Sequence, residues 1–376
     1  MASASQIIVV KGPRSNDRHW SAAAERTLDA LGTWEAVQID PAAPPEEHTS
    51  QAARLDAALS QASALLLCGW GPMGISYLSA DRLARAPNLR FIGSTCHYRQ
   101  AQFVDMQVAL ARGIAFCETA PVMSPWVAEH ELALGLAALR QIPQEHAIVG
   151  AGGWVDMLDV PDWPDRLHGR RVGLASFGEI HRHLARLLAP FETEWEAFDP
   201  YVPSDMITAS GGRKVDSLVA MAARSDVFFV ATPPTPETLG TTNRDVIAAL
   251  PHHAVFVLVS RMAVVEQEPL LHRLRAGELR AAIDVYDPEP PPAGSPWRTL
   301  PNVIHTPHRA GNTRGAHQGV FLAQCQEAQR QFASEPLRYP LRPELVALFR
   351  PPCPAPAGAS PRVTGAGSSP AAAPKA

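Results

Sequence analysis

Three polar side chains that lie far apart in the chain have the types needed to bind an acid and move a proton. Arg261 can bind a carboxylate in bidentate form, which a lysine cannot. Histidine is the residue type that most readily exchanges a proton in either direction of a reaction, which makes His308 a candidate acid/base. Glu289 is a carboxylate that can hold such a histidine in one tautomer and keep it protonated. These types fit hydride transfer to a 2-keto acid, in which the carbonyl oxygen gains a proton.

Each of these residues also has an ordinary structural explanation. Arg261 can be a surface helix cap, Glu289 a solvated loop acid, and His308 one of 14 histidines. Their joint placement favours function, because each follows an apolar run, at 257–260, 281–285 and 302–305. The carboxyl ends of parallel strands meet at one edge of a sheet, so we expect the three side chains to gather there.

The elements that would position these residues alternate between short apolar runs and longer helical stretches. This alternation predicts α/β structure, with parallel sheets and crossover helices. Two helical patterns stand apart: 125–143 joins two series of strands, and 315–332 should return to cover the first unit. The predicted strands lie at 7–10, 64–68, 90–93 and 114–117 in the first series, and at 171–175, 194–199, 226–231, 254–260 and 280–285 in the second.

The stretch "RVGLASFGEIHRHLA" at 171–185 reads as a strand that runs into a helix through a turn poor in glycine. Laid over the dinucleotide pattern GxGxxG, it keeps only Gly178, with Ser176 and His181 in place of the first and third glycines. Taken alone, the turn fits a plain strand-to-helix corner equally well. Asp199, about 20 residues further on, is placed to accept hydrogen bonds from a ribose and to repel a 2′-phosphate, which favours NAD over NADP. An Asp before Pro is also a common turn former.

Composition narrows the classes of partner. The formal net charge of -4 and the pI near 6.4 provide no basic surface for nucleic acid or anionic lipid, so a small-molecule ligand is expected. No apolar run approaches the roughly 18 residues that a membrane span needs, and residues 1–10 do not resemble a signal peptide, so we expect a cytoplasmic protein. The five cysteines are odd in number and include no CxxC pair. We therefore predict reduced thiols and no metal site.

Several longer blocks resemble the D-isomer-specific 2-hydroxyacid dehydrogenase family, from residue 90 to about 320. They are "LARAPNLRFIG", "ALARGIAFCET", "VAEHELAL" and "ARSDVFFVATPPTPET", in the order in which the family has them. The resemblance implies two doubly wound parallel-sheet domains. A Rossmann-like NAD domain at 119–311 would be inserted in a flavodoxin-like substrate domain formed by 1–118 and 312–345. The Pro- and Ala-rich stretch 346–376 is too poor in large apolar residues to fold alone and is expected to be disordered.

The same resemblance implies the activity and the roles of individual residues. The family interconverts a small 2-hydroxy acid and its 2-keto acid with NAD, and Arg261, Glu289 and His308 match its catalytic set, with His308 as the acid/base. Asp284 is expected beside the nicotinamide, and a homodimer through the cofactor domain is implied. The residues expected to line the cofactor are Gly178, Glu179, Ile180, Asp199, Thr232, Val259, Ser260, Asp284 and Gly311.

The chain departs from the family pattern at identifiable places. An imidazole at His181 can offset the lost glycine by contacting phosphate, and Met262 follows the catalytic arginine where the family usually has glycine. The loop 94–102 replaces a glycine-rich loop that receives the substrate carboxylate. Its residues Cys96, His97 and Arg99 are candidates for substrate binding, and Trp70 can close the pocket beside them. A solvated loop of altered length is the alternative interpretation.

These departures keep a second function open. A chain with an eroded glycine loop can be a catalytically weak NAD(H)-binding sensor or interaction protein of the same fold. The retention of all three catalytic residue types argues for the enzyme.

Overall fold

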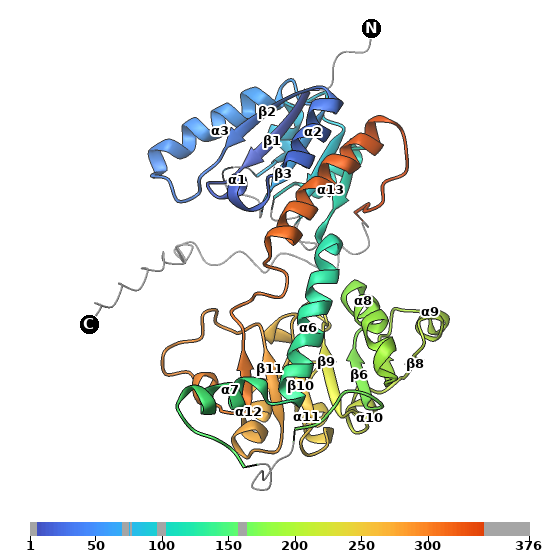
Figure 1. The fold of residues 1–376 in the computed structure, drawn as a ribbon. Coiled ribbons are helices and arrows are strands. Elements are labelled where there is room, and N and C mark those ends of the chain that lie inside the picture. Colours follow the sequence, from blue (N-terminus) through green and yellow to red (C-terminus); the bar gives the residue numbers. More distant parts are fainter. Residues whose placement is uncertain (1–5, 70–74, 76, 96–102, 157–163, 342–376) are drawn as a thin grey trace, which may run out of the picture.

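The computed structural model describes residues 6–69, 75, 77–95, 103–156 and 164–341. They form two parallel sheets, each with its own helices, which make up the upper and lower halves of Figure 1. The Pro- and Ala-rich stretch after residue 345 lies outside the described residues. The predicted α/β class and the two doubly wound sheets are confirmed.

The upper sheet has five parallel strands in the order β2-β1-β3-β4-β5, the flavodoxin-like order. The helix α13, formed by residues 314–332, packs against it, because Phe321 and Cys325 are buried in one cluster with Ile7 and Phe91. The returning helix predicted at 315–332 is therefore confirmed. The bounds are β1 Gln6–Lys11, α1 Ser15–Arg18, α2 Ala22–Leu31, β2 Thr33–Gln38, α3 Pro45–Leu59, β3 Ala64–Cys68, α4 Ala80–Ala84, β4 Phe91–Ser94, α5 Met106–Ala111, β5 Ala115–Glu118 and α13 Arg314–Phe332.

The lower sheet has seven parallel strands in the order β12-β11-β10-β9-β6-β7-β8. The chain reverses its direction across the sheet between β6 and β9, as in a Rossmann fold, and this switch point is where such sheets bind ligands. Its central strands are buried on both faces, as their apolar runs predict. The bounds are β6 Arg171–Ala175, α8 Glu179–Leu188, η3 Ala189–Phe191, β7 Glu194–Phe198, α9 Ser204–Ala209, β8 Arg213–Lys214, α10 Leu218–Ala222, β9 Val227–Val230, α11 Arg244–Ala249, β10 Val255–Leu258, η4 Met262–Val264, α12 Gln267–Arg275, β11 Arg280–Ile283, η5 Pro296–Thr299 and β12 Val303–His305.

A long helix, α6 (Ser124–Leu139), follows the short turn η2 (Ala120–Met123) and runs from the upper unit down along the lower sheet (Figure 1). The single helix predicted over 125–143 ends early, because Gln141 adopts a left-handed conformation with φ 54°. A second helix, α7 (Ile142–Gly150), then begins with Pro143 in its first turn, and none of its residues is buried.

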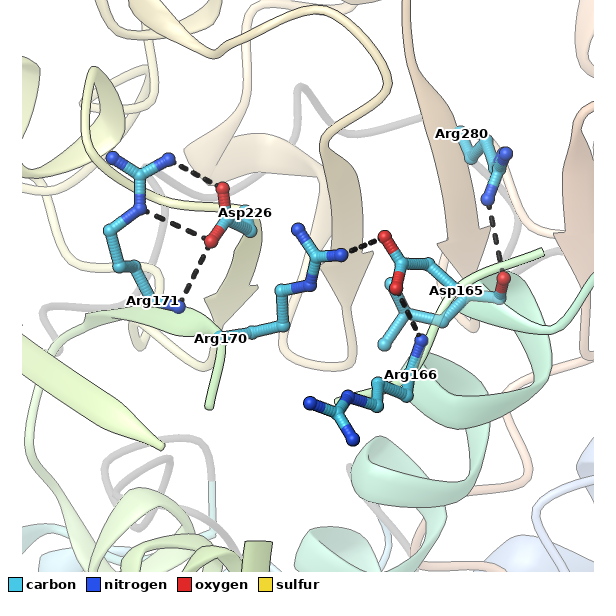
Figure 2. A network of polar contacts seen from close by, with 7 residues as sticks. Asp165, Arg166, Arg170, Arg171, Asp226 and Arg280 are labelled. Atoms are coloured by element: carbon cyan, nitrogen blue, oxygen red, sulfur yellow. Dashed lines mark hydrogen bonds and ion pairs between the residues drawn. The ribbon is translucent and has the colours of Figure 1, made fainter. Parts of the chain in front are cut away.

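A group of ion pairs and hydrogen bonds lies around the starts of the lower strands (Figure 2). Arg171 at the start of β6 contacts Asp226, which precedes β9, at 2.6 Å, and Arg170 pairs with Asp165. Arg280 at the start of β11 donates to the carbonyl oxygen of Leu139, at the end of α6, at 3.3 Å. This network lies at the amino edge of the sheet, opposite the edge where α/β sheets bind ligands, so we assign it to stability.

The cysteines that the structure describes are buried thiols without disulfides, as predicted: Cys68, Cys117 and Cys325. Burial raises the pKa of Cys68 to about 12 and raises the pKa of the other two. These thiols are therefore poor nucleophiles at neutral pH. Cys96 and Cys353 lie outside the described residues.

Candidate active site

His308 and Glu289 form a contact at the end of the lower sheet. The Nδ1 atom of His308 lies 2.8 Å from Oε2 of Glu289, and the two side chains are 41% and 37% exposed. The other carboxylate oxygen, Oε1, accepts the backbone N–H of Tyr286 at 2.9 Å, which fixes the orientation of the acid. Because Nδ1–H donates to the carboxylate, Nε2 is the ring nitrogen that can exchange a proton with a bound acid.

The loop 306–310, which presents His308, is held by the buried carboxylate of Asp284. This carboxylate accepts hydrogen bonds from Oγ1 of Thr306 at 2.5 Å and from the backbone N–H groups of Arg309 and Ala310 at 2.8 and 3.0 Å. His308 itself has φ 53°, a left-handed conformation that is strained for a residue with a Cβ. The side chain of Asp284 has no exposed surface, so it contributes to the site by holding this loop.

A further histidine, His130 of α6, reaches the same carboxylate. Its Nε2 atom lies 3.3 Å from Oγ1 of Thr306 and 3.6 Å from Oδ1 of Asp284. Burial alone would raise the pKa of Asp284, but hydrogen bonds from His130, Thr306 and the two amides outweigh burial and lower the pKa. Asp284 is therefore ionised at neutral pH. Sequence reasoning missed His130, although a histidine within the apolar helical stretch 125–143 was a usable signal.

Arg261 follows β10, the strand next to β11, while Glu289 and His308 follow β11 and β12. The three residues thus come after neighbouring strands at one carboxyl edge. The Nη1 atom of Arg261 donates to the carbonyl oxygen of Ser260 at 2.6 Å. Met262, the departure from glycine, is buried in the core under this edge while Arg261 keeps an extended backbone, so the larger residue is accommodated without distortion.

The turn after β6 keeps two features that suit a dinucleotide loop despite its lost glycines: a left-handed residue and an open glycine at the start of α8. Ser176, at the first glycine position, has φ 82°, the left-handed conformation that a glycine would supply. Gly178 caps the N-terminus of α8, and a Cβ there would meet no atom within 4 Å, so the space next to this glycine is open. A helix N-terminus with free space beside it can receive a phosphate, so these residues fit a dinucleotide.

Polar groups expected along the cofactor are placed as follows. Asp199 accepts the backbone N–H groups of Phe177, Tyr201 and Val202 at 2.8, 2.9 and 3.2 Å, which is the turn-forming role that Asp-Pro suggested. Its predicted contact with a ribose stays a prediction. Oγ1 of Thr232 donates to the carbonyl oxygen of Ala175 at 3.0 Å. The hydroxyl of Ser260 is buried and has no hydrogen-bond partner among the described residues.

The predicted contact between His181 and phosphate is wrong. The imidazole is fully buried, with Nδ1 2.7 Å from the carbonyl oxygen of Ser176 and Nε2 3.3 Å from Oε1 of Glu131 on α6. Both ring nitrogens are therefore occupied on the inner side of α8. A buried partner for His181 could be anticipated only from Glu131, an acid in an otherwise apolar helical stretch.

The remaining cofactor candidates differ in their surroundings. Glu179 is exposed and pairs with Arg182 at 2.8 Å, Ile180 is half-buried, and Val259 is buried. A Cβ on Gly311 would lie 2.9 Å from Cε of Met123, so this glycine lets the loop pack against η2. The candidates for substrate binding, Cys96, His97 and Arg99, and also Trp70, lie outside the described residues.

Two absences hold for the part of the chain that the structure describes. None of its helices combines the length and the apolar character that crossing a membrane requires. Nor does it contain a group of three or more His, Cys, Asp or Glu side chains arranged to hold a metal ion.

Comparisons with known proteins give a consistent result. Residues 132–310 match the family model described as "D-isomer specific 2-hydroxyacid dehydrogenase, NAD binding domain". The chain is 30% identical to the D-3-phosphoglycerate dehydrogenase of Methanocaldococcus jannaschii over 276 residues, which are 71% of this chain and 48% of that protein. It thus spans about half the length of the first curated relatives that it matches.

Two solved structures are similar over nearly their whole length. The crystal structure of a phosphoglycerate oxidoreductase from Rhizobium etli superposes with a TM-score of 0.75 at 28% identity, covering 90% of this chain and 98% of that one. A 2-hydroxyacid dehydrogenase from Ketogulonicigenium vulgare superposes with a TM-score of 0.68 at 25% identity, covering 90% and 99%. The similarity therefore extends well beyond the matched domain.

Proposed function

Because the chain belongs to the D-isomer-specific 2-hydroxyacid dehydrogenase family, we propose that it is an NAD-dependent oxidoreductase that interconverts a small 2-hydroxy acid and its 2-keto acid. The observation that carries this proposal is the 2.8 Å contact between Nδ1 of His308 and Oε2 of Glu289 at the carboxyl edge of the seven-stranded sheet. A partly exposed imidazole held by a carboxylate is what proton transfer to a carbonyl oxygen requires.

Each residue of the set has one task in the proposed reaction. Bound NAD(H) would supply or accept the hydride. Arg261 binds the substrate carboxylate and so orients the carbonyl group. His308 gives its Nε2 proton to the carbonyl oxygen in reduction and takes it back in oxidation. Glu289 stabilises the imidazolium form of His308 through Nδ1.

We assign the cofactor to the carboxyl edge around β6, β7 and β10. The N-terminus of α8 at Gly178 would receive the pyrophosphate. We expect the carboxylate of Asp199 to lie near the adenosine ribose and to repel a 2′-phosphate, which favours NAD. The other proposed cofactor residues are Glu179, Ile180, Thr232, Val259, Ser260 and Gly311, and also Asp284, which would act through the loop that its buried carboxylate holds.

We divide the chain into a substrate domain, 1–118 with 312–345, and an NAD-binding domain, 119–311. Support comes from the packing of α13 on the upper sheet, where Nε2 of Gln324 donates to the carbonyl oxygen of Leu67 at 3.0 Å. The backbone N–H of Glu118 also donates to the carbonyl oxygen of Tyr339 at 2.9 Å, so the chain returns to β5. A cytoplasmic location stays a prediction from the sequence.

We also propose a homodimer, built on α7 and the segment that follows it. No residue of α7 is buried, and Ile142, Val149, Trp154 and Val155 expose apolar side chains, with Trp154 83% exposed. A short helix with no fully buried residue gains little stability from its own chain, and the family resemblance points to a second copy as its partner. Sedimentation should show a dimer that Val149→Glu with Trp154→Glu dissociates; a monomeric wild type would contradict this.

The activity is tested with a panel of 2-keto acids, following the loss of NADH absorbance. We expect turnover with at least one acid. NADH at about 100 times its dissociation constant should also stabilise the fold by about 2.7 kcal/mol. Stabilisation without turnover across the panel would favour the second candidate, an NAD(H)-binding sensor, which the loss of two loop glycines supports.

A further inference from the structure

Two fully buried titratable side chains that the proposed reaction does not use connect the nucleotide loop to α6. His181 lies at the third glycine position of the loop, and Glu131 lies on α6, fifty residues away in the chain. Both side chains are 0% exposed. The ring of His181 contacts the carbonyl oxygen of Ser176 at 2.7 Å on one side and the carboxyl group of Glu131 at 3.3 Å on the other.

The partners determine how protons are placed in this group. A carbonyl oxygen can only accept, so Nδ1 of His181 carries a hydrogen that it donates to Ser176. One more proton must then lie between Nε2 of His181 and Oε1 of Glu131, because two facing lone pairs and an unpaired buried negative charge would be strongly unfavourable. The group therefore has no net charge whether that proton is on nitrogen or on oxygen.

The accepted hydrogen bond acts at the strained residue of the loop. Ser176 has φ 82°, a conformation that a residue with a Cβ adopts only where its surroundings impose it. Its backbone N–H donates to the carbonyl oxygen of Phe198 at 2.8 Å, and its own carbonyl oxygen accepts from His181. Ser176 is thus held on both sides, and the second contact depends on His181.

We propose that Glu131 and His181 are positioning residues for the cofactor: they hold Ser176 in the left-handed conformation and so replace, by a buried hydrogen-bond relay, the glycines that the loop has lost. Both side chains are buried beneath the loop, so neither would contact the cofactor directly. The inference rests on the proposed use of NAD(H), because the loop conformation that it preserves is the one that receives the pyrophosphate.

The first test measures the dissociation constant of NADH by fluorescence in variants of Glu131. Glu131→Leu leaves Nε2 of His181 without a partner, and we expect it to weaken NADH binding about tenfold, the effect of one lost buried hydrogen bond. Glu131→Gln can donate to neutral His181 through its amide and should bind NADH within about threefold of wild type. Glu129→Leu makes the same change at an exposed position of α6 and serves as the control.

The second test asks whether the relay acts through Ser176. Ser176→Gly adopts the left-handed conformation without strain, so in that background Glu131→Leu should weaken NADH binding by less than about threefold. An equal loss of affinity in both backgrounds would overturn the inference, as would an unchanged affinity in Glu131→Leu alone. If Glu131→Leu fails to fold, His181→Ala replaces it in both backgrounds with the same expectations.

A measurement without cofactor separates this inference from the proposed function. Hydrogen–deuterium exchange of the backbone amides in 176–180 should be faster in Glu131→Leu than in wild type and in Glu131→Gln, with NADH absent. Faster exchange in a protein that never binds NADH would overturn the proposed function and keep the relay as a loop clamp. Unchanged exchange in a protein that binds NADH would overturn the relay.

Discussion

Two loops at the carboxyl edge of the lower sheet each stabilise a left-handed residue, but through different contacts. Each contains a non-glycine residue in the left-handed region, Ser176 in the nucleotide loop and His308 in the loop that carries the candidate acid/base. Each is held by a fully buried acid. Asp284 acts directly, accepting hydrogen bonds from the second loop, whereas Glu131 acts through the ring of His181.

The two loops differ in the charge of the buried group that holds them. Asp284 is a carboxylate surrounded by N–H and O–H donors that lower its pKa, so it holds its loop as an anion through charge-assisted hydrogen bonds. Glu131 and His181 together carry no net charge. The loop proposed to present the proton donor is thus held by a buried anion, while the loop proposed to receive anionic phosphates is held by a neutral group.

The largest effect is expected at the tip of the second loop. His308→Ala removes the proposed proton donor, and we expect the turnover number to fall about 1000-fold, within the usual range for general acid–base catalysis. NADH affinity should stay near that of wild type, because the other loop is untouched. A variant that keeps more than a tenth of the wild-type turnover number would remove His308 from the proposed role.

The next effect is on stability, at the anion that holds this loop. Asp284→Asn places an amide against backbone N–H donors, and we expect it to lower the free energy of unfolding by about 3 kcal/mol at pH 7, measured in urea. The pKa of Asp284 is lowered in the folded protein, so its contribution is present above the unfolded pKa of about 3.9 and is lost as the pH falls through the folded value. The difference from wild type should therefore shrink in acid. A constant difference down to low pH would contradict the anionic role.

Glu289→Gln tests the contact that orients the candidate acid/base. The amide oxygen can still accept from Nδ1 of His308, but the NH2 group then faces the backbone N–H of Tyr286, which is itself a donor, so that hydrogen bond is lost. The amide also cannot stabilise an imidazolium by charge, so the turnover number should fall about 100-fold, less than in His308→Ala. The KM for the keto acid should change little, because Glu289 is not assigned to substrate binding. A rise in KM alone would point to a role in binding.

The smallest effect is expected in the nucleotide loop. Ser176→Gly removes the strain of a left-handed residue, of about 1–2 kcal/mol, and adds the backbone freedom of glycine, which costs about 0.5–1 kcal/mol. A net gain of about 0.5 kcal/mol in the free energy of unfolding follows from these two terms. A clear loss would show that the serine side chain, not its backbone, is what the loop needs.

Most of the fold could be predicted from the apolar runs, because central strands buried on both faces read as unbroken apolar segments. The strands at 64–68 and 171–175 have the predicted bounds. The strand β2 was missed, since Thr33–Gln38 lies at the sheet edge and buries Val37 while most of its other side chains are exposed. An exposed edge strand carries little apolar signal.

The candidate site could likewise be predicted from the sequence only in part. That Arg261, Glu289 and His308 follow neighbouring strands could be argued from the sequence alone, because a small set of connection rules restricts the strand order of such sheets. The direction in which a side chain points could not be predicted from the sequence. Only the structure shows that His181 faces inward to Glu131, since that direction depends on the packing of α8 against α6, which sequence spacing does not encode.

His130 and Glu131 are consecutive residues of α6, and neighbours on a helix point about 100° apart around its axis. One therefore reaches Thr306 and Asp284, and the other reaches His181. This same helix leaves the upper unit and runs along the lower sheet (Figure 1). Any rotation or sliding of α6 would therefore move both side chains together, so the proposed coenzyme loop and the proposed proton donor both depend on the position of one helix.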